Sequence, residues 1–360
     1  MNERNHEIDF FRLVFALFIM GHHAAGLLGW NHCKDGAIGV EFFFVVAGVF
    51  FARSIKRVAC DPDLNPPKSL YRDSVRFIFH KISIFYPYFL FSFIVAFTVR
   101  QMIPGIRLWN ILENGVGSIW ELLMLQTAGY AGYWPTGTGW YLSALILAQW
   151  ILYPLARKNY HRFIYWISPL AVILINGISN YNYPTIHGTV DLFLGFASRG
   201  ILRAINEICL GSIAYEVALW LAKLSLTKLA RGLLTALEVF CYGFTIASAW
   251  YMPISQYDYV LLLLIAIAVT ITISGQGLIG SWFQGRLPLA KFSLVLFMNH
   301  FYWALAIQVW LPQWSAAQKT LLFFGISFVT AIVCLIVVDA IKRTFKPEVW
   351  KKRLLKEEPV

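Results

Sequence analysis

Long apolar runs recur along the whole chain and are separated by short polar gaps. Each run is about 17–25 residues long, which is the length that an α-helix needs to cross the hydrocarbon core of a bilayer. Of the 360 residues, 58% are hydrophobic and only 14% are charged, whereas soluble domains are about 45–50% apolar. The sequence therefore predicts an integral membrane protein that folds as a single all-α, polytopic helical bundle.

We predict about ten transmembrane helices from run length and hydropathy. They lie near residues 8–28, 37–55, 77–99, 140–156, 163–178, 200–221, 232–250, 258–275, 289–310 and 320–341. The membrane domain accordingly covers residues 1–341. Residues 342–360 form a basic tail that is typical of a helix lying on an anionic inner leaflet.

The Lys and Arg residues predict the orientation of the chain. When the gaps alternate sides with the N-terminus inside, 22 of the 30 Lys and Arg residues fall on the inner side and 6 on the outer side, and Arg12 and Lys81 lie within spans. This bias predicts that both termini are cytoplasmic and that the protein is a multi-pass component of a bacterial inner or plasma membrane. Because the basic residues are spread over many gaps, the net charge of +11 indicates contact with the lipid bilayer and not with nucleic acid.

The cysteines and the standard active-site motifs exclude several classes of protein. The five cysteines are odd in number and show no metal-ligand spacing; they are Cys33, Cys60, Cys209, Cys241 and Cys334. We therefore expect neither a disulfide framework nor a bound metal. The absence of GxSxG, HExxH, GxGxxG and P-loop patterns excludes the matching hydrolase, metalloprotease and nucleotide-binding classes.

The first span carries polar residues that lipid would reject. Within FFRLVFALFIMGHHAAGLLG, Arg12 and His23 are separated by about 20° around a helix after whole turns, and Asp9 lies within about 60° of Arg12. This polar stripe predicts that the helix faces the interior of the bundle. A cleaved signal peptide is the alternative for this segment.

The second span brings a carboxylate to a similar depth. Glu41 in GVEFFFVVAG enters about one turn below the outer surface, close to the depth that we expect for His23. A neutral imidazole can act as a general base, and a carboxylate on its other nitrogen stabilises the cation that forms. The alternative is that His23 and Glu41 only hold two helices together.

Several segments are similar, in order, to one family of membrane enzymes. Arg12, ten intervening residues and His23, followed by GVEFFFVVAG, resemble the N-terminal signature of the membrane-bound acyltransferase-3 family. KISIFYPYF, GWYLSALILAQWILYPL and LAKFSLVLFMNHFYW, which ends near His300, resemble later elements of that family. The chain departs from the family pattern at Ala47, where Ser is usual, and at Ala144-Leu145, where one branch carries an acidic pair.

The resemblance implies transfer of an acyl group, most often acetyl, to a hydroxyl group. The donor would be acetyl-CoA or another cytoplasmic acyl-CoA, and the acceptor a surface polysaccharide or its lipid-linked sugar precursor. The implied catalytic residues are His23, Glu41 and Arg12, with His23 as either a base or an acyl carrier. The basic side chains that would bind the CoA phosphates are Arg72, Arg76 and Lys81. Setting the topology is the alternative role for Arg72 and Arg76.

Aromatic residues at the outer face, a serine within a span and a histidine near mid-membrane are candidates for binding the acceptor. They are Trp140, Ser143, Tyr181, Tyr183 and His300. Interfacial anchoring is the alternative for the aromatic residues, and a helix contact is the alternative for His300. Arg203 and Glu207 are spaced to form an ion pair on one helix.

Two other classes of function remain open from the residues alone. A non-catalytic transporter or flippase for a lipid-linked glycan would also need charges inside the membrane, but no internal repeat relates the two halves of the chain. A structural or regulatory membrane subunit would not need Arg12, His23 and Glu41 on facing helices. Acyl transfer is therefore the leading prediction.

Overall fold

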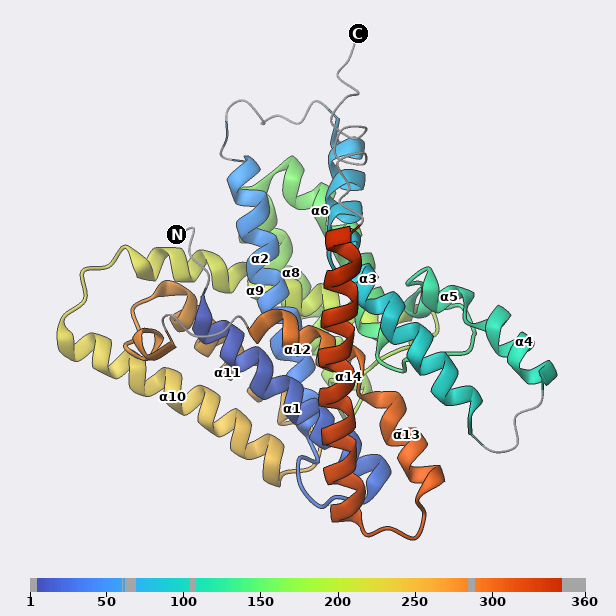
Figure 1. Ribbon diagram of the computed structural model, residues 1–360. Helices are drawn as coiled ribbons and strands as arrows, with labels where there is room; N and C mark the ends of the chain where they lie inside the picture. The colour runs from blue at the N-terminus through green and yellow to red at the C-terminus, as the bar shows by residue number, and fades with distance from the viewer. Residues whose placement is uncertain (1–4, 60, 62–68, 104–107, 284–288, 345–360) are drawn as a thin grey trace.

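The computed structural model describes residues 5–59, 61, 69–103, 108–283 and 289–344. These residues form an almost entirely helical protein (Figure 1). The strands within the described residues are β1 (Leu192–Phe193) and β2 (Ala197–Ser198), which pair antiparallel in one loop. The prediction of an all-α fold is confirmed.

Among the described residues, eight helical segments are long and apolar enough to cross a membrane, by length and composition. They are α1 (His6–Leu28), α2 (Gly39–Ala59) with the preceding η1 (Gly36–Ile38), α3 (Leu70–Gln101), α6 (Gly139–Lys158), α7 (Tyr160–Arg162) continued by the π-helix η3 (Phe163–Ile167) and α8 (Ser168–Asn182), α9 (Arg199–Ala222), α10 (Lys228–Tyr251) and α14 (Ala316–Thr344). The chain is therefore a multi-pass membrane protein.

Two further apolar segments deviate from a straight full-length span. Helix α11 (Asp258–Ser274) is only 17 residues long. Helices α12 (Leu289–Met298) and α13 (Phe301–Trp310) are bent by 44° at a short break. The remaining helices are short: α4 (Leu108–Gly117), α5 (Ile119–Leu122), η2 (Gln126–Ala128) and η4 (Ile279–Phe283).

Each of the ten predicted spans falls on helix, but one prediction of shape was wrong. The segment 289–310 was expected to be one continuous helix, whereas the structure interrupts it at Asn299 and His300. The count of ten spans and the cytoplasmic position of both termini stay predictions. Of the predicted basic tail, residues 345–360 lie outside the described residues.

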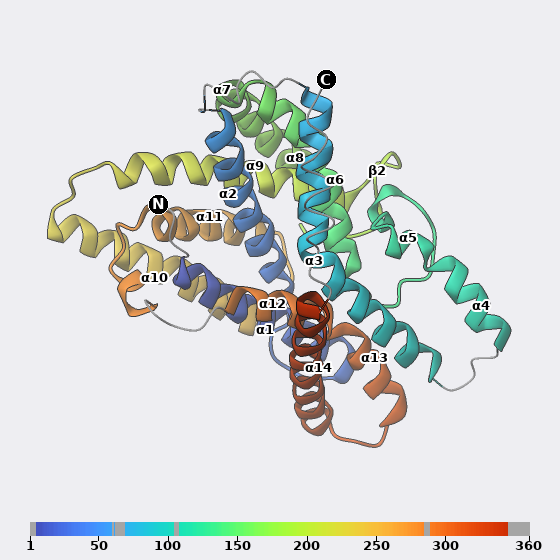
Figure 2. The ribbon, with the colours of Figure 1, turned by 45° about the horizontal axis from the view of Figure 1, so that its top comes forward.

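The arrangement of the helices separates two wings from a central group. Helices α2, α3 and α14 stand upright in the middle, with α9, α10 and α11 extending to one side and α4 and α5 to the other (Figures 1 and 2). Helix α1 packs against α12, α13 and α2. The first span thus lies at the centre of the bundle, as its polar stripe predicted.

Helices α2 and α9 approach each other closely because two glycines face across their contact. A Cβ atom on Gly48 would lie 2.4 Å from the carbonyl oxygen of Ile208, and one on Gly211 would lie 2.0 Å from that of Val45. Small residues allow membrane helices to pack backbone to backbone. This contact sets Glu41 of α2 opposite Arg203 of α9.

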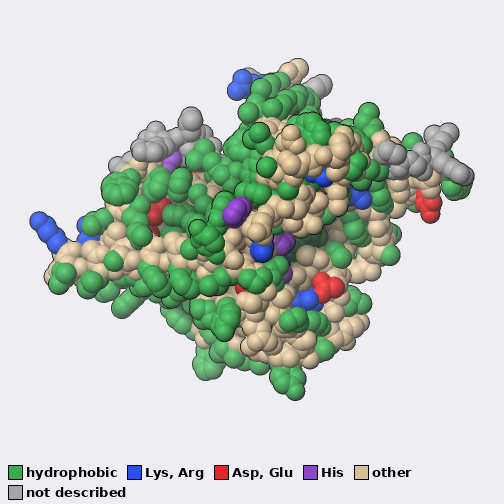
Figure 3. All heavy atoms as spheres, turned by 90° about the horizontal axis from the view of Figure 1, so that it is seen from below, with side chains coloured by type: hydrophobic (Ala, Val, Ile, Leu, Met, Phe, Trp, Pro, Cys, Tyr) green, Lys and Arg blue, Asp and Glu red, His purple; other side chains and the backbone are tan. Residues whose placement is uncertain are grey.

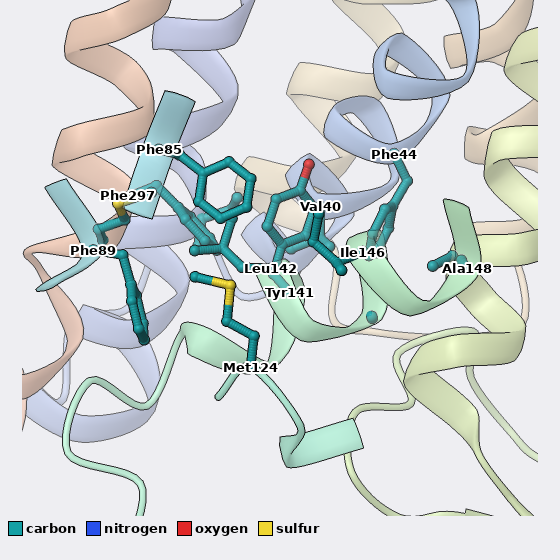
Figure 4. Close-up of a cluster of buried hydrophobic side chains, with 14 of the residues drawn as sticks. Val40, Phe44, Phe85, Phe89, Met124, Tyr141, Leu142, Ile146, Ala148 and Phe297 are labelled. Atoms are coloured by element: carbon teal, nitrogen blue, oxygen red, sulfur yellow. The ribbon is translucent and has the colours of Figure 1, made fainter. Parts of the chain in front are cut away.

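A large hydrophobic cluster fills the space between α2, α3, α6 and α12 (Figure 4). The ring centroid of Tyr141 lies 4.5 Å from that of Phe44 and 5.3 Å from that of Phe297. Met124, which follows α5, is buried against the same cluster. The core therefore joins the first half of the chain to the segment just before the α12–α13 break.

Candidate active site

His23 of α1 meets a second histidine, His300, inside the bundle. Their imidazole centroids are 5.1 Å apart and the ring planes are tilted by 33°. The ring of Phe301 lies 4.7 Å from that of His23. Because His300 lies at the break between α12 and α13, the bend in this segment places an imidazole directly beside the first span.

The hydrogen bonding of His300 leaves one of its nitrogens available. Its Nδ1 atom lies 2.7 Å from the carbonyl oxygen of Phe297. A carbonyl only accepts, so Nδ1 carries a proton and Nε2 of the neutral ring presents a lone pair. Within the described part of the chain this buried Nε2 atom has no hydrogen-bond partner. It can therefore accept a hydrogen bond from a substrate hydroxyl group.

Polar groups reach the surface near the centre of one end of the bundle. The face that is seen from below carries histidine, basic and some acidic side chains near its middle, among hydrophobic and uncharged atoms (Figure 3). His22, the neighbour of His23 in sequence, contacts the carbonyl oxygen of Lys34 through its Nδ1 atom at 2.8 Å. Lys34 belongs to the connection between α1 and α2. The end of α1 that carries His22 is therefore covered by this polar connection.

Arg12 lies at the opposite end of α1. Its Nη1 atom is 3.8 Å from the Oδ1 atom of Asp9, and its guanidinium lies 5.2 Å from the ring centroid of Phe50. Asp9 is buried. The predicted polar stripe of α1 therefore begins with an ion pair that α2 helps to cover.

The expected contact between His23 and Glu41 was wrong. No hydrogen bond or ion pair joins these two described residues. The Oε1 atom of Glu41 instead contacts Nη2 of Arg203 and lies 3.3 Å from Nδ1 of His187. The close α2–α9 packing explains the difference, because it turns Glu41 toward α9 and away from α1.

Glu41 belongs to a buried group of charged residues that we call the Glu41 cluster: Asp35, Glu41, His187, Arg203, Glu207 and Asp258. Nε2 of His187 lies 3.1 Å from an oxygen of Asp35 and 3.1 Å from an oxygen of Asp258. Nε of Arg203 lies 3.6 Å from Glu207. The predicted Arg203–Glu207 pair is confirmed, but it is buried and not at the surface.

Two members of the cluster that lie in loops have shifted pKa values. Burial raises the pKa of the Asp35 carboxyl to about 6, although His187 beside it opposes that rise. Burial by itself would lower the pKa of His187, but the carboxylates of Glu41, Asp258 and Asp35 outweigh it and raise that pKa well above its usual range. The cluster therefore favours a positive charge at the position of this imidazole.

The predicted phosphate-binding residues lie along the first turns of α3. Arg72 and Arg76 are exposed, whereas Lys81 is half-buried and places its Nζ atom 5.3 Å from the ring centroid of Phe77. Lys81 also lies close enough to Arg12 for the two charges to repel each other. The structure thus brings two basic residues together that are 69 positions apart in the sequence.

The predicted acceptor-binding residues have different partners in the structure. The ring of Trp140 lies 5.5 Å from the guanidinium of Arg203, and Ser143 is buried with its Oγ atom 2.8 Å from that of Thr127. Tyr183 stacks 4.0 Å from the guanidinium of Arg199. Tyr181 is 90% exposed. Of the five predicted residues, His300 alone contacts His23.

Sequence reasoning missed three of the six residues of the Glu41 cluster. Asp35, His187 and Asp258 lie in or beside three connections that are far apart in the chain. One signal was present, because His187 is the histidine of the long polar segment SNYNYPTIHGTVD. The residues that surround His187 could not be predicted, because they depend on how the helices pack.

Comparison with known protein families decides the class of this protein. A family model described as an acyltransferase domain matches residues 5–339. The chain belongs to the acyltransferase-3 family. It is therefore an acyltransferase that transfers groups other than aminoacyl groups, and it uses an acyl donor and an acceptor substrate. Comparisons with curated proteins and with solved structures found no match.

Proposed function

We propose that this acyltransferase moves an acetyl or similar acyl group from cytoplasmic acyl-CoA to a hydroxyl group of a surface polysaccharide or its lipid-linked precursor. The observation that carries the proposal is the pair of imidazoles of His23 and His300, whose rings lie 5.1 Å apart. One of them, His300, has a buried nitrogen with no hydrogen-bond partner among the described residues. A transfer to a hydroxyl group needs such a proton acceptor inside the bundle.

In the proposed reaction His23 takes the proton of the acceptor hydroxyl group. The acceptor oxygen attacks the thioester carbonyl carbon, a C–O bond forms, the C–S bond breaks, and the proton passes to the CoA sulfur. His300 accepts a hydrogen bond through its free Nε2 atom from a neighbouring hydroxyl group of the same sugar, because the single proton of the reacting hydroxyl goes to His23. Glu41 does not contact His23, so we assign it to positioning His187 and Arg203.

A second route would carry the acyl group on the His23 imidazole before transfer. The two routes differ in what forms when donor is present without acceptor. An acyl-imidazole would add the mass of the acyl group to the peptide that contains His23. Mass spectrometry after incubation with labelled acyl-CoA alone therefore separates them.

The basic residues near the start of α3 are the proposed site for the donor. The charges of Lys81 and Arg12 lie close enough to repel each other, and the exposed residues Arg72 and Arg76 precede Lys81 by about 2.5 and 1.4 helical turns. Arg binds phosphate through its planar fork and Lys as a point charge. Along α1, Arg12 and His23 are about 16 Å apart, so a thioester would reach toward His23 from this end. Trp140, Tyr181 and Tyr183 are the proposed sugar-facing residues.

Replacing His23 tests the proposed function. His23→Ala should lower acyl transfer at least about 100-fold, since a general base contributes about 10²–10⁴-fold, while the protein stays folded in the membrane. The measurement is mass spectrometry of the host's surface glycans with and without each variant. His161→Ala, which changes a histidine that stacks on Tyr165 outside the site, is the matched control. Full activity of His23→Ala would reject the assignment.

Replacing Lys81 tests the donor site separately. Lys81→Ala should weaken binding of labelled acetyl-CoA to the purified protein about 10-fold, because one charge-assisted contact to a phosphate is lost. Lys291→Ala serves as control, since that lysine pairs with Asp339 at 2.5 Å. Unchanged affinity of Lys81→Ala would remove the phosphate role.

The broken helix α12–α13 also favours a second candidate function. Transporters often build their substrate sites from interrupted helices, and the break here contains His300. A flippase for a lipid-linked glycan would move its cargo with or without acyl-CoA. Continued glycan translocation by His23→Ala, together with loss of translocation in a deletion strain, would favour that alternative.

A further inference from the structure

Three potential metal ligands converge at one end of the bundle from separate connections. They are Oδ1 of Asp35 in the α1–α2 connection, Nε2 of His187 in the α8–α9 connection and Oδ2 of Asp258 at the start of α11. All three atoms lie within 4.8 Å of one another. The side chains of Asp35 and His187 are only 1% and 8% exposed, so the group is enclosed by protein.

We propose that Asp35, His187 and Asp258 bind one divalent transition-metal ion. The nitrogen of His187 lies 3.1 Å from each of the two carboxylate oxygens. Two donor atoms that each lie about 2.1 Å from a metal are about 3.0 Å apart in octahedral and about 3.4 Å apart in tetrahedral coordination. An imidazole with two carboxylates is a donor set that suits Zn²⁺ or Mn²⁺. Water molecules would complete the coordination.

The surroundings of Asp35 point to the same site. Its Oδ1 atom is buried and accepts no well-formed hydrogen bond from the described residues; its polar contact is the ring nitrogen Nε2 of His187 at 3.1 Å. A buried carboxylate oxygen without a donor is costly, and a cation at the shared centre of the three ligands would satisfy it. Oδ2 of Asp258, in contrast, is held by the backbone N–H of Ser255 at 3.0 Å.

The groups around the three ligands are those that orient metal ligands. Nδ1 of His187 lies 3.3 Å from a carboxylate oxygen of Glu41. A metal-bound histidine usually donates its other ring N–H to a carboxylate, which fixes the tautomer and turns the free lone pair toward the metal. Arg203 holds the same oxygen of Glu41 in place.

The charge balance of the Glu41 cluster also requires cations. The cluster contains one permanently positive side chain, that of Arg203, and four buried carboxyl groups: Asp35, Glu41, Glu207 and Asp258. Protonation of His187 would add one positive charge, whereas a divalent ion bound to the neutral imidazole would add two. A bound ion would tie together three connections at this end of the protein. The inference rests on this geometry and does not depend on the proposed function.

Metal analysis of the full chain tests the inference. The protein is purified in detergent without a polyhistidine tag, stripped with a chelator, reloaded with Zn²⁺ or Mn²⁺ and freed of excess metal. We expect about one bound ion per folded chain and a higher Tm after reloading. His187→Gln and Asp258→Asn should lower the bound metal at least about 10-fold. His32→Gln, which replaces an exposed histidine stacked on Trp250, should keep the full amount.

Two results would overturn the inference. Folded wild-type protein that retains neither ion after reloading would show that a protonated His187 alone balances the carboxylates. Full retention of metal by His187→Gln would place the ion elsewhere. If the variants do not fold, X-ray absorption of the reloaded wild type decides, because a first shell without imidazole nitrogen contradicts the proposed ligands.

Discussion

Glu121 is a buried carboxyl group whose protonation depends on pH near neutrality. It lies in α5, outside the candidate membrane spans, and it is fully buried. It accepts the backbone N–H of Thr136 at 3.4 Å and also the hydroxyl group of that residue. Burial raises the pKa of Glu121 to about 7, although the hydrogen bonds from Thr136 oppose the rise. The folded protein therefore holds a proton here that the unfolded chain releases near pH 4.5.

This shift predicts that stability falls as pH rises. A group that binds its proton more tightly when folded stabilises the fold fully below its unfolded pKa, and that stabilisation is lost as pH rises through the folded pKa. The Tm of the wild type should therefore fall between pH 5 and pH 8. Glu121→Gln keeps a neutral side chain of the same shape, so its fall in Tm should be smaller by about 2–4 °C.

The measurement is a series of thermal unfolding scans in detergent across that pH range. Glu113→Gln, which changes an exposed residue of the adjacent helix α4, is the control and should follow the wild type. The pKa of Asp35 is raised to about 6. Its titration also lowers the Tm as pH rises, and this decrease should remain in both Glu121→Gln and Glu113→Gln. Identical pH profiles for Glu121→Gln and the wild type would show that Glu121 does not titrate in this range.

At the scale of elements, the α2–α9 contact decides where the buried charges lie. The two helices touch through Gly48 and Gly211, and the same pair of helices carries Glu41 and Arg203. Across this contact the Oγ atom of Ser212 in α9 lies 3.4 Å from the carbonyl oxygen of Gly48 in α2. The family pattern has Ser-Gly where this chain has Ala47-Gly48, and the glycine of that pair is the residue that the close packing requires.

Adding one methyl group to this contact should disrupt it. In Gly211→Ala the new Cβ atom would lie 2.0 Å from the carbonyl oxygen of Val45, so the helices must separate. We expect a loss of about 1–3 kcal/mol of stability, measured as a lower Tm. Gly243→Ala in α10 is the control, because nothing lies within 4 Å of its Cβ position; it should be neutral or stabilising by about 0.5–1 kcal/mol. Equal effects of the two substitutions would contradict this account of the packing.

The break between α12 and α13 is the second element that shapes the site. Without the 44° bend, residue 300 would lie on a regular helix and its Nδ1 atom would have no free backbone carbonyl to contact. The break frees the carbonyl oxygen of Phe297, which the ring then binds. A regular helix satisfies its own carbonyl groups, so the imidazole pair of His23 and His300 depends on this irregularity.

At the scale of the whole molecule, the charge distribution predicts which end of the bundle faces the cytoplasm. The excess of Lys and Arg places residues 53–76 on the inner side and residues 179–199 on the outer side. On this assignment Arg72 and Arg76 meet cytoplasmic acyl-CoA, and the Glu41 cluster lies toward the outer face. The acyl group would therefore cross part of the membrane thickness on its way to the acceptor.

Cysteine labelling in whole cells tests this orientation. Tyr181, which is 90% exposed, and Tyr71, which is 77% exposed, are replaced by Cys in a Cys60→Ser background; the other four cysteines are buried. A membrane-impermeant thiol reagent should label Tyr181→Cys at least about 10-fold more than Tyr71→Cys if positive residues stay inside. Both should react equally in permeabilised cells. The reverse pattern would invert the topology and remove the cytoplasmic donor site.

The membrane fold was predictable because its signals are local. A run of apolar residues must form a helix in lipid, since every backbone polar group has to be satisfied within the segment. The same reasoning marked Arg12 and His23 as residues of an interior face, because lipid rejects them. The family resemblance of the segments around them was confirmed by the match to residues 5–339.

The sequence by itself determined the class of fold, the helices and the polar face of the first span, because each depends on residues within one segment. Only the tertiary structure decided the partners of those polar residues. Glu41 contacts Arg203 and His187 because two glycines allow α2 and α9 to pack closely. His23 contacts His300 because a bend interrupts α12–α13. These contacts join residues that are more than 140 positions apart in the sequence. The spacing of polar residues within one helix does not specify which distant helix will pack against that helix.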